Sequence, residues 1–178
     1  MSEGSICILC GSSGSGKTTA LVRMLDLITL TNLTCRGILC PPVFRDGEKT
    51  GIDLYDVSTG DVHSLAELNL TRETNLATHG WKLDARVVKL GNEILNLAIP
   101  CDILFVDELG PLEFERGEGL MEGFRAINSR AYQFAFVTIR PSLLNAALQR
   151  WPDATVFSVI RSDQDSLIMK MLELVKRN

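Results

Sequence analysis

Residues 11–18 are Gly-Ser-Ser-Gly-Ser-Gly-Lys-Thr, the segment that most strongly indicates how the chain folds. The pattern is G-x-x-x-x-G-K-[ST], which forms a phosphate-binding loop when it joins a strand to a helix. An apolar run, Ser5–Cys10, comes directly before it and ends at a glycine, as a buried parallel strand does. From Lys17 to about Leu30 the apolar residues repeat with helical spacing. The motif therefore lies in the strand–loop–helix context that phosphate binding requires.

Each part of this loop is chemically suited to a nucleoside triphosphate. Glycines let backbone N–H groups converge on phosphate oxygens, and the start of the following helix adds a partial positive charge. Lys17 is placed to contact the β- and γ-phosphates, which makes it a candidate catalytic residue, and the Thr18 hydroxyl is placed to bind Mg²⁺. The residues expected to bind the nucleotide are Gly11, Ser12, Ser13, Gly14, Ser15, Gly16, Lys17, Thr18 and Thr19.

A second motif is the short apolar run Ile103–Val106, which ends in Asp107 and Glu108. A buried strand would deliver both acids to the carboxyl edge of the sheet, where open α/β sheets bind ligands. Asp107 is then a candidate Mg²⁺ ligand opposite Thr18 and part of the nucleotide site. Glu108 is the candidate catalytic residue that orients or deprotonates an attacking water. Without the phosphate loop, two adjacent acids at a strand end would read equally well as solvated side chains.

Arginine side chains are a third feature, because they can stabilise charge that develops on a transferred phosphoryl group. Arg140 follows a strand expected over 133–139 and should lie on the same rim of the sheet, so it is a candidate catalytic residue. Arg45, at the tip of an expected hairpin, is a second candidate. A solvated surface arginine is the alternative interpretation for both. Glu113 is a candidate supporting group beside the second motif.

The remaining segments alternate between strand and helix patterns. This alternation predicts an α/β fold of the P-loop NTPase type, with a mostly parallel sheet covered by helices on both faces. Beyond the strands already named we expect one over 155–160, and helices over 17–30, 84–100, 118–130, 142–150 and 163–177. No repeat or linker-like stretch interrupts the chain, so we expect residues 1–178 to form a single domain.

Residues 37–60 depart from this alternation and predict a β-hairpin insertion. The segment Gly37–Pro42 is apolar, and Gly51–Val57 alternates apolar with polar residues as a half-buried strand does. The pair Asp46-Gly47 between them is a turn signal. Residues 61–80 are polar, and their role cannot be assigned from the pattern.

The overall composition narrows the class of protein. The 178 residues are 46% hydrophobic and 22% charged, which excludes intrinsic disorder. No apolar run reaches the ~18 residues that a membrane-spanning helix needs, so no membrane partner is expected. The net charge of −4 argues against nucleic acid as a partner, because nucleic-acid binding usually requires a basic surface. The composition says nothing of a protein partner.

The cysteines and the N-terminal flank bear on the compartment. Five cysteines are an odd number and do not suggest a secreted disulfide framework. Cys7 and Cys10 lie three apart on an expected strand and should face opposite ways, so we expect buried thiols there and no shared metal. The opening residues 1–5 carry an acid where a signal peptide needs a basic flank. We therefore expect a cytoplasmic protein.

Three blocks of sequence resemble the small nucleoside-triphosphatases first described from thermophilic bacteria, which have relatives in archaea and animals. The blocks are the loop Gly11–Thr19, the hairpin segment Arg36–Gly60, and Val106-Asp-Glu-Leu-Gly-Pro-Leu-Glu-Phe114. The third block is similar to the family's Asp-Glu-Ile-Gly-Pro-Met-Glu-Leu signature. The resemblance implies Mg²⁺-dependent hydrolysis of ATP, GTP and other nucleoside triphosphates to the diphosphate, with broad base tolerance.

Two other functions fit the same motifs. In a nucleoside or nucleotide kinase, a small acceptor would replace water, although no cluster of lid arginines is visible in the sequence. In a nucleotide-dependent partner switch, slow hydrolysis would serve only as a timer. No N-K-x-D or T-K-x-D motif follows the second strand, which disfavours a dedicated GTPase switch.

Overall fold

The computed structural model describes residues 4–69, 77–78 and 80–176. Within them, one ten-stranded sheet has the order β10-β1-β9-β8-β2-β4-β5-β7-β6, and β3 pairs with β4. The first five strands of this order run parallel to one another. They are β1 Ser5–Cys10, β2 Cys35–Leu39, β8 Ile103–Val106, β9 Phe134–Ile139 and β10 Thr155–Ser158. This half of the sheet is the parallel core that the alternating pattern predicts.

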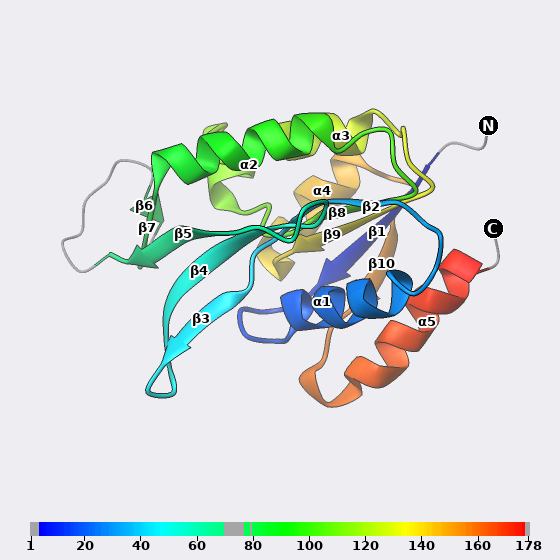
Figure 1. The fold of residues 1–178 in the computed structure, drawn as a ribbon, viewed down its shortest axis with the longest axis horizontal. Helices are drawn as coiled ribbons and strands as arrows, with labels where there is room; N and C mark the ends of the chain where they lie inside the picture. Colours follow the sequence, from blue (N-terminus) through cyan, green and yellow to red (C-terminus); the bar gives the residue numbers. More distant parts are fainter. Residues whose placement is uncertain (1–3, 70–76, 79, 177–178) are drawn as a thin grey trace.

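Helices cover both faces of the parallel strands, which confirms the α/β class (Figure 1). α1 and α5 pack on one face, and α2, α3 and α4 pack on the other. The helices are α1 Lys17–Ile28, α2 Ala85–Leu97, α3 Glu122–Asn128, α4 Leu144–Arg150 and α5 Gln164–Lys176. Short helical turns precede three of them: η1 Leu112–Arg116, η2 Pro141–Leu143 and η3 Arg161–Asp163.

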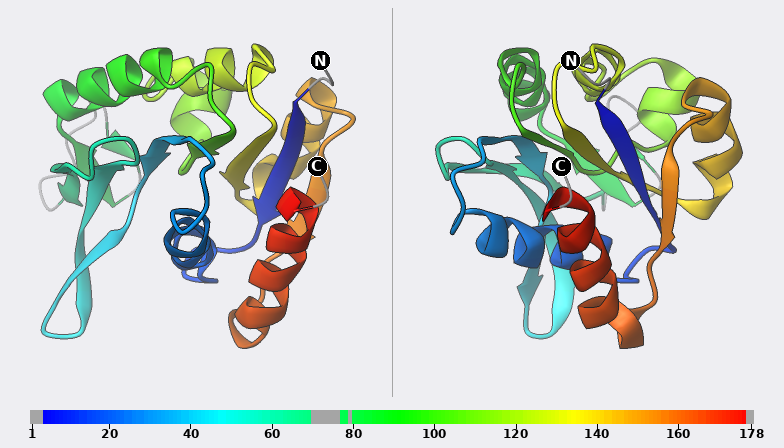
Figure 2. Two further views of the ribbon diagram at one scale, coloured as in Figure 1. Left: turned by 45° about the vertical axis from the view of Figure 1, so that its right-hand side comes forward. Right: turned by 90° about the vertical axis from the view of Figure 1, so that its right-hand side faces the viewer.

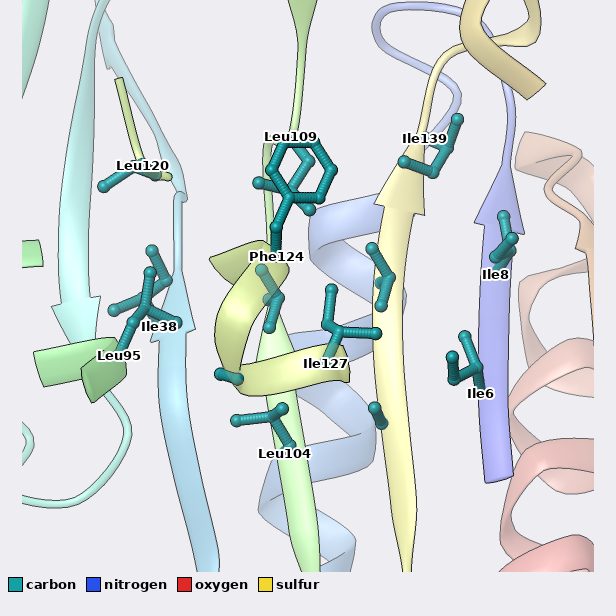
Figure 3. Close-up of a cluster of buried hydrophobic side chains, with 14 of the residues drawn as sticks. Ile6, Ile8, Ile38, Leu95, Leu104, Leu109, Leu120, Phe124, Ile127 and Ile139 are labelled. Atoms are coloured by element: carbon teal, nitrogen blue, oxygen red, sulfur yellow. The ribbon is translucent and has the colours of Figure 1, made fainter. Parts of the chain in front are cut away.

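The central strands are buried on both faces, so alternate residues enter two different cores. Ile6 and Ile8 of β1 face the core beneath α2, α3 and α4, which Figure 3 shows in close-up. Cys7 and Leu9 face the core beneath α1 and α5. Cys10 lies on the Ile6 face and is buried, like Cys7. The two cysteines therefore point in opposite directions as free thiols, as the strand geometry predicts.

The second half of the sheet is antiparallel and larger than the predicted hairpin. Its strands are β3 Pro42–Arg45, β4 Glu48–Asp56, β5 Val62–Leu68, β6 Ala77–Thr78 and β7 Trp81–Leu83. Residues 61–69, which the sequence left unassigned, supply β5, which pairs along β4. The hairpin β3–β4 extends away from the rest of the molecule (Figure 2).

The hairpin differs from its prediction in one arm. The turn is at Asp46-Gly47 as expected, with φ values of 51° and 84°, which suit a two-residue hairpin turn. The arm expected over Gly37–Pro42 pairs antiparallel with β4 as predicted, through Ile38 and Leu39 and then through Pro42. It is divided, however, because β2 ends at Leu39 and a separate strand, β3, begins at Pro42. Ile38 and Leu39 are fully buried, which suits the central position of β2 between β8 and β4.

The helix expected over 118–130 is wrong at its beginning. The chain forms the π-helical turn η1 first, and α3 begins only at Glu122. Gly117 and Gly119 have φ values of 64° and 82°, which end one turn and prevent a continuous helix. Elsewhere the helix boundaries lie within a few residues of the expected ones. In the described part of the chain, no helix is long and apolar enough to cross a membrane.

Candidate active site

The phosphate loop connects β1 to α1 at the carboxyl edge of the parallel strands. Gly14 and Gly16 have φ values of 75° and 93°, a backbone conformation that favours glycine and that the loop requires. Gly16 is the N-cap residue of α1, so no capping side chain competes for the first amides of the helix. These amides and the positive end of the helix dipole are available to an anion. The structure thus has the strand–loop–helix arrangement that the motif predicts.

Lys17 is the first residue of α1 and is only 9% exposed. Its Nζ donates hydrogen bonds to the carbonyl oxygens of Gly11, at 2.8 Å, and Ser12, at 3.0 Å. The ammonium group is therefore curled over the loop to which it belongs. Burial lowers the pKa of Lys17, while the charges of Glu108 and Asp107 act to raise it. Both acids of the second motif thus lie within electrostatic reach of the loop lysine.

The other loop residues form an open rim. Ser12, Ser13, Gly14 and Thr19 are exposed, and Thr18 is half-buried. Ser15 differs, because its Oγ is buried and makes no hydrogen bond within the described residues. An unpaired buried hydroxyl costs free energy, so the loop retains a polar atom that a ligand could satisfy.

Asp107 directly follows β8 and is completely buried. Because Phe105 faces α1, Asp107, two residues further, points to the same face as Lys17 and Thr18. Its Oδ2 accepts a hydrogen bond from the Cys40 backbone N–H at 2.9 Å. Its Oδ1 accepts one from the Thr138 hydroxyl at 2.6 Å and one from the Glu108 backbone N–H at 3.1 Å. The carboxylate is therefore held in a single orientation.

This donor set fits magnesium. Mg²⁺ prefers oxygen ligands, keeps several waters, and is usually held by one or two protein groups together with substrate phosphates. A carboxylate has about four lone-pair positions, and the hydrogen bonds to Asp107 use three, so one position is open. The described residues contain no group of three or more His, Cys, Asp or Glu side chains that could hold a metal ion. Thr18 and Asp107 are the residues that could hold it.

Glu108 has an unusual backbone conformation, with φ of 65°. Its backbone N–H donates to the Thr138 hydroxyl at 2.9 Å, and its side chain is 30% exposed. Burial and the neighbouring Asp107 raise the pKa of Glu108, whereas the charges of Arg140, Lys17 and Lys49 oppose the rise. A partly exposed carboxyl group with a raised pKa suits general acid–base work.

The structure brings one of the two candidate arginines to this site. Arg140 follows β9, and its Nη2 lies 3.7 Å from Oε2 of Glu108. The Arg140 side chain is 44% exposed, so it can reach a ligand from the rim. Arg45 ends β3 beside the hairpin turn, is exposed, and lies on the arm that projects from the molecule (Figure 2). The geometry therefore favours Arg140.

Glu113 supports the loop after β8. It is 6% exposed, and its two carboxylate oxygens accept hydrogen bonds from the backbone N–H groups of Gly110 and Leu120, each at 2.8 Å. These bonds fasten both ends of the segment that includes η1. Burial raises the pKa of Glu113, and the two backbone hydrogen bonds act against the rise. Its place is beneath the site, as the sequence suggested.

Two features of the site were missed by sequence reasoning. Thr138 is buried, 1% exposed, at the penultimate position of β9. A polar residue near the end of an apolar strand was the sequence signal that could have identified it. Lys49 lies with its Nζ 4.8 Å from the ring centre of Trp81, and its charge acts on Glu108. No local pattern indicates Lys49, because its position depends on the pairing of β4 with β5 and of β5 with β7.

A small, partly open cavity of about 60 Å³ adjoins the acids. Glu108, Arg140 and the turn beginning at Gly110 form one side, and residues of β4, β5 and β7, including Trp81, form the other. A larger hollow of about 360 Å³ lies farther along the antiparallel strands, between β5, β7 and the start of α2. None of the predicted site residues lines that hollow, so only the smaller cavity concerns the chemistry.

Comparisons with known proteins agree with this geometry. A model of a family described as NTPase matches residues 6–172. The chain is 26% identical to a protein of Methanopyrus kandleri named nucleoside-triphosphatase THEP1, over 94% of this chain and 93% of that protein. It is 23% identical to the protein of the same name from Methanothermobacter thermautotrophicus, over 94% of each.

Two solved structures share the fold. The solution structure of a human cancer-related nucleoside triphosphatase superposes with a TM-score of 0.73 and 18% identity, over 98% of this chain and 99% of that one. The crystal structure of THEP1 from Aquifex aeolicus gives a TM-score of 0.69 and 17% identity, over 96% and 98%. The whole chain, including its antiparallel half, therefore follows a known architecture.

Proposed function

The chain belongs to the NTPase family, and on that premise we propose that it hydrolyses nucleoside triphosphates by direct attack of water on the γ-phosphorus. Relatives that match more than nine-tenths of the chain are named nucleoside-triphosphatases, and this protein is an enzyme of that kind. The observation that carries the mechanism is that Lys17, Asp107 and Glu108 meet at one edge of the sheet. They lie close enough there for the charge of each acid to raise the pKa of Lys17.

The phosphate loop would bind the substrate. The amides at the start of α1 and the Lys17 ammonium would replace the hydrogen bonds that phosphate oxygens make with water. On binding, the Lys17 Nζ would exchange the Gly11 and Ser12 carbonyls for phosphate oxygens. Thr18 and Asp107 would hold Mg²⁺, which when bound neutralises charge on the β- and γ-phosphates. The loop would contact the phosphates and not the base, which supports ATP, GTP and other nucleoside triphosphates as substrates.

Glu108 and Arg140 would carry out the chemical step. The Glu108 carboxylate would orient the attacking water and accept its proton. Arg140 lies close enough to the carboxylate, at 3.7 Å, to influence its position, and it can also approach the transferred phosphoryl group. The oxygen–phosphorus bond forms as the bond to the diphosphate breaks, and the diphosphate leaves with its charge balanced by the loop.

The cavity beside Glu108 has room for the attacking water. Its volume is about 60 Å³, and one water needs about 10–15 Å³ by a measure of this kind. A water next to the Glu108 carboxylate could therefore act as the nucleophile.

A cytoplasmic location remains a prediction, supported by the five free thiols. Nucleoside triphosphates are the binding partners that the site supports.

The test is phosphate release from ATP, GTP, CTP and UTP by the wild type and by Glu108→Gln. We expect turnover of all four nucleotides with Mg²⁺, and a loss of about 10²–10⁴-fold in kcat for Glu108→Gln, the usual contribution of a general base. Glu173→Gln, on the exposed face of α5, is the matched control and should behave as wild type. Chelation of the metal with EDTA should abolish turnover in all three proteins.

Two results would contradict the proposal. Full turnover by Glu108→Gln would show that another group handles the water. Tight nucleotide binding without phosphate release by the wild type would favour the partner switch or a missing acceptor.

A further inference from the structure

The side chain of Thr138 occupies a central position beneath the candidate active site. It comes from the penultimate residue of β9 and is 1% exposed. The register of β8 and β9 pairs Val106 with Val137, so the next residue along each strand places Asp107 beside Thr138. Among the described residues, the Thr138 hydroxyl makes hydrogen bonds to Asp107 and to Glu108, not to the phosphate loop. The proposed chemistry does not use the hydroxyl directly.

The hydroxyl makes two hydrogen bonds of opposite sense. It donates to Oδ1 of Asp107 at 2.6 Å, a distance typical of a bond to an ionised carboxylate. It accepts from the backbone N–H of Glu108 at 2.9 Å. The same N–H also lies 3.1 Å from Oδ1 of Asp107. Thr138 therefore joins the candidate metal ligand to the backbone of the candidate base.

The second of these bonds bears on the direction of the Glu108 side chain. Glu108 has φ of 65°, a conformation that residues other than glycine adopt only when their surroundings impose it. At this φ the Glu108 side chain lines the small cavity together with Arg140. Without the bond from its N–H to Thr138, the peptide would lose a constraint that holds it there.

We propose that Thr138 is a positioning residue for phosphoryl transfer, which holds Glu108 in its strained conformation and thereby aims the carboxylate at the attacking water. This role rests on the proposed function of Glu108. Thr138 is buried, and its hydroxyl forms its hydrogen bonds with protein groups, so it acts through Glu108 and, secondarily, by fixing one oxygen of Asp107.

The test compares pairs of variants that differ mainly in the hydroxyl group. Thr138→Val replaces the hydroxyl with a methyl group of similar shape. Thr138→Ser and Thr138→Ala both lack the γ-methyl group, and only serine retains the hydroxyl. For each variant, kcat and KM for ATP are measured with saturating Mg²⁺, and thermal unfolding is followed in parallel. Thr155→Val, on the exposed edge strand β10, is the control for the same exchange in a strand.

We expect Thr138→Val and Thr138→Ala to lower kcat by about 10–100-fold, the usual effect of losing a group that orients a site residue. KM should change little, because the phosphate loop is intact. Thr138→Ser should retain most of the wild-type kcat even if it unfolds at a lower temperature. If serine and alanine lower kcat equally, the hydroxyl has no positioning role and the proposal is overturned.

A double variant shows through which acid Thr138 acts. If it acts through Glu108, adding Thr138→Val to Glu108→Gln should cost little further activity, because the group to be aimed is already gone. Losses that multiply fully would mean that Thr138 acts only through Asp107 or the fold, which overturns the proposal. A wild type that releases no phosphate overturns the proposed function as well. A wild type that hydrolyses ATP at the same rate as Thr138→Val overturns this inference alone.

Discussion

The close approach of β2 to β8 makes Gly37 the position where the smallest change should do the most damage. Gly37 is buried and has φ of 105°. A Cβ atom built there would lie 2.0 Å from the backbone carbonyl oxygen of Phe105, its partner across the two strands. A backbone atom cannot move aside as a side chain can, so Gly37→Ala must separate β2 from β8.

Gly47→Ala supplies a matched control for the magnitude. Gly47 has φ of 84°, and a Cβ there meets nothing within 4 Å. Both variants carry the penalty for an L-residue at positive φ, about 1–2 kcal/mol. Gly37→Ala adds the overlap with Phe105, which in a packed core costs about 1–3 kcal/mol. We therefore expect Gly37→Ala to lose about 2–5 kcal/mol of unfolding free energy, and Gly47→Ala about 1–2 kcal/mol.

The assays are urea unfolding at 25 °C, which gives the unfolding free energy, and thermal unfolding, which gives Tm; both are followed by circular dichroism. At about 2–4 °C per kcal/mol for a chain of this size, the Tm of Gly37→Ala should fall by roughly 10 °C. Because β2 leads into Cys40, whose N–H binds Asp107 at 2.9 Å, Gly37→Ala should also lose phosphate release. Equal losses of stability in the two variants would refute the claim that contact between the strand backbones is what requires glycine at residue 37.

Three further predictions concern single side chains. Lys17→Ala should abolish binding of a fluorescent ATP analogue, because the buried ammonium is the loop's own cation; binding at wild-type strength would exclude the assigned loop role. Arg140→Ala should lower kcat by about tenfold or more with little change in stability, since the side chain is 44% exposed; an unchanged kcat would leave Arg140 as a surface residue. Asp84 caps α2 by accepting from the Arg86 N–H at 2.8 Å, and the Arg86 hydrogen bonds lower its pKa from 3.8 to about 2. Its stabilising contribution is therefore present above pH 3.8 and is lost as the pH falls towards 2, so the urea midpoints of wild type and Asp84→Ala should converge over that window.

The parts of the site that the sequence predicted are those with a local signal. The loop of residues 11–18 is defined by residue type and spacing, and the strand before it and the helix after it follow from short-range periodicity. Asp107 and Arg140 each come directly after a buried strand, Glu108 follows Asp107, and parallel strands end at the same edge. Their meeting therefore follows from topology alone, without knowledge of any side-chain contact.

The antiparallel half was harder to predict because its signals are weak. β5 has two consecutive buried residues, Leu65 and Ala66, where β4 and β5 change register, so the strict alternation expected of a half-buried strand is lost. β7 has only three residues, Trp81–Leu83. The cation–π contact of Lys49 with Trp81 joins strands 32 residues apart in the chain, and no local pattern reports it.

What this sequence determined by itself is the class of fold, the phosphate loop and the edge of the sheet at which the acids gather. These features depend on spacing within about one strand and one helix, where local geometry leaves few alternatives. Only the tertiary structure decided that Thr138 joins Asp107 to the backbone of Glu108, that Glu113 fastens the following loop, and that Glu108 adopts a positive φ. The Glu113 bonds span only three and seven residues, but they depend on the irregular turn η1, which no helical or strand periodicity predicts. The Thr138 bonds span 30 and 31 residues and depend on the register of β8 and β9, which the packing of the whole core sets and no short stretch of residues can encode.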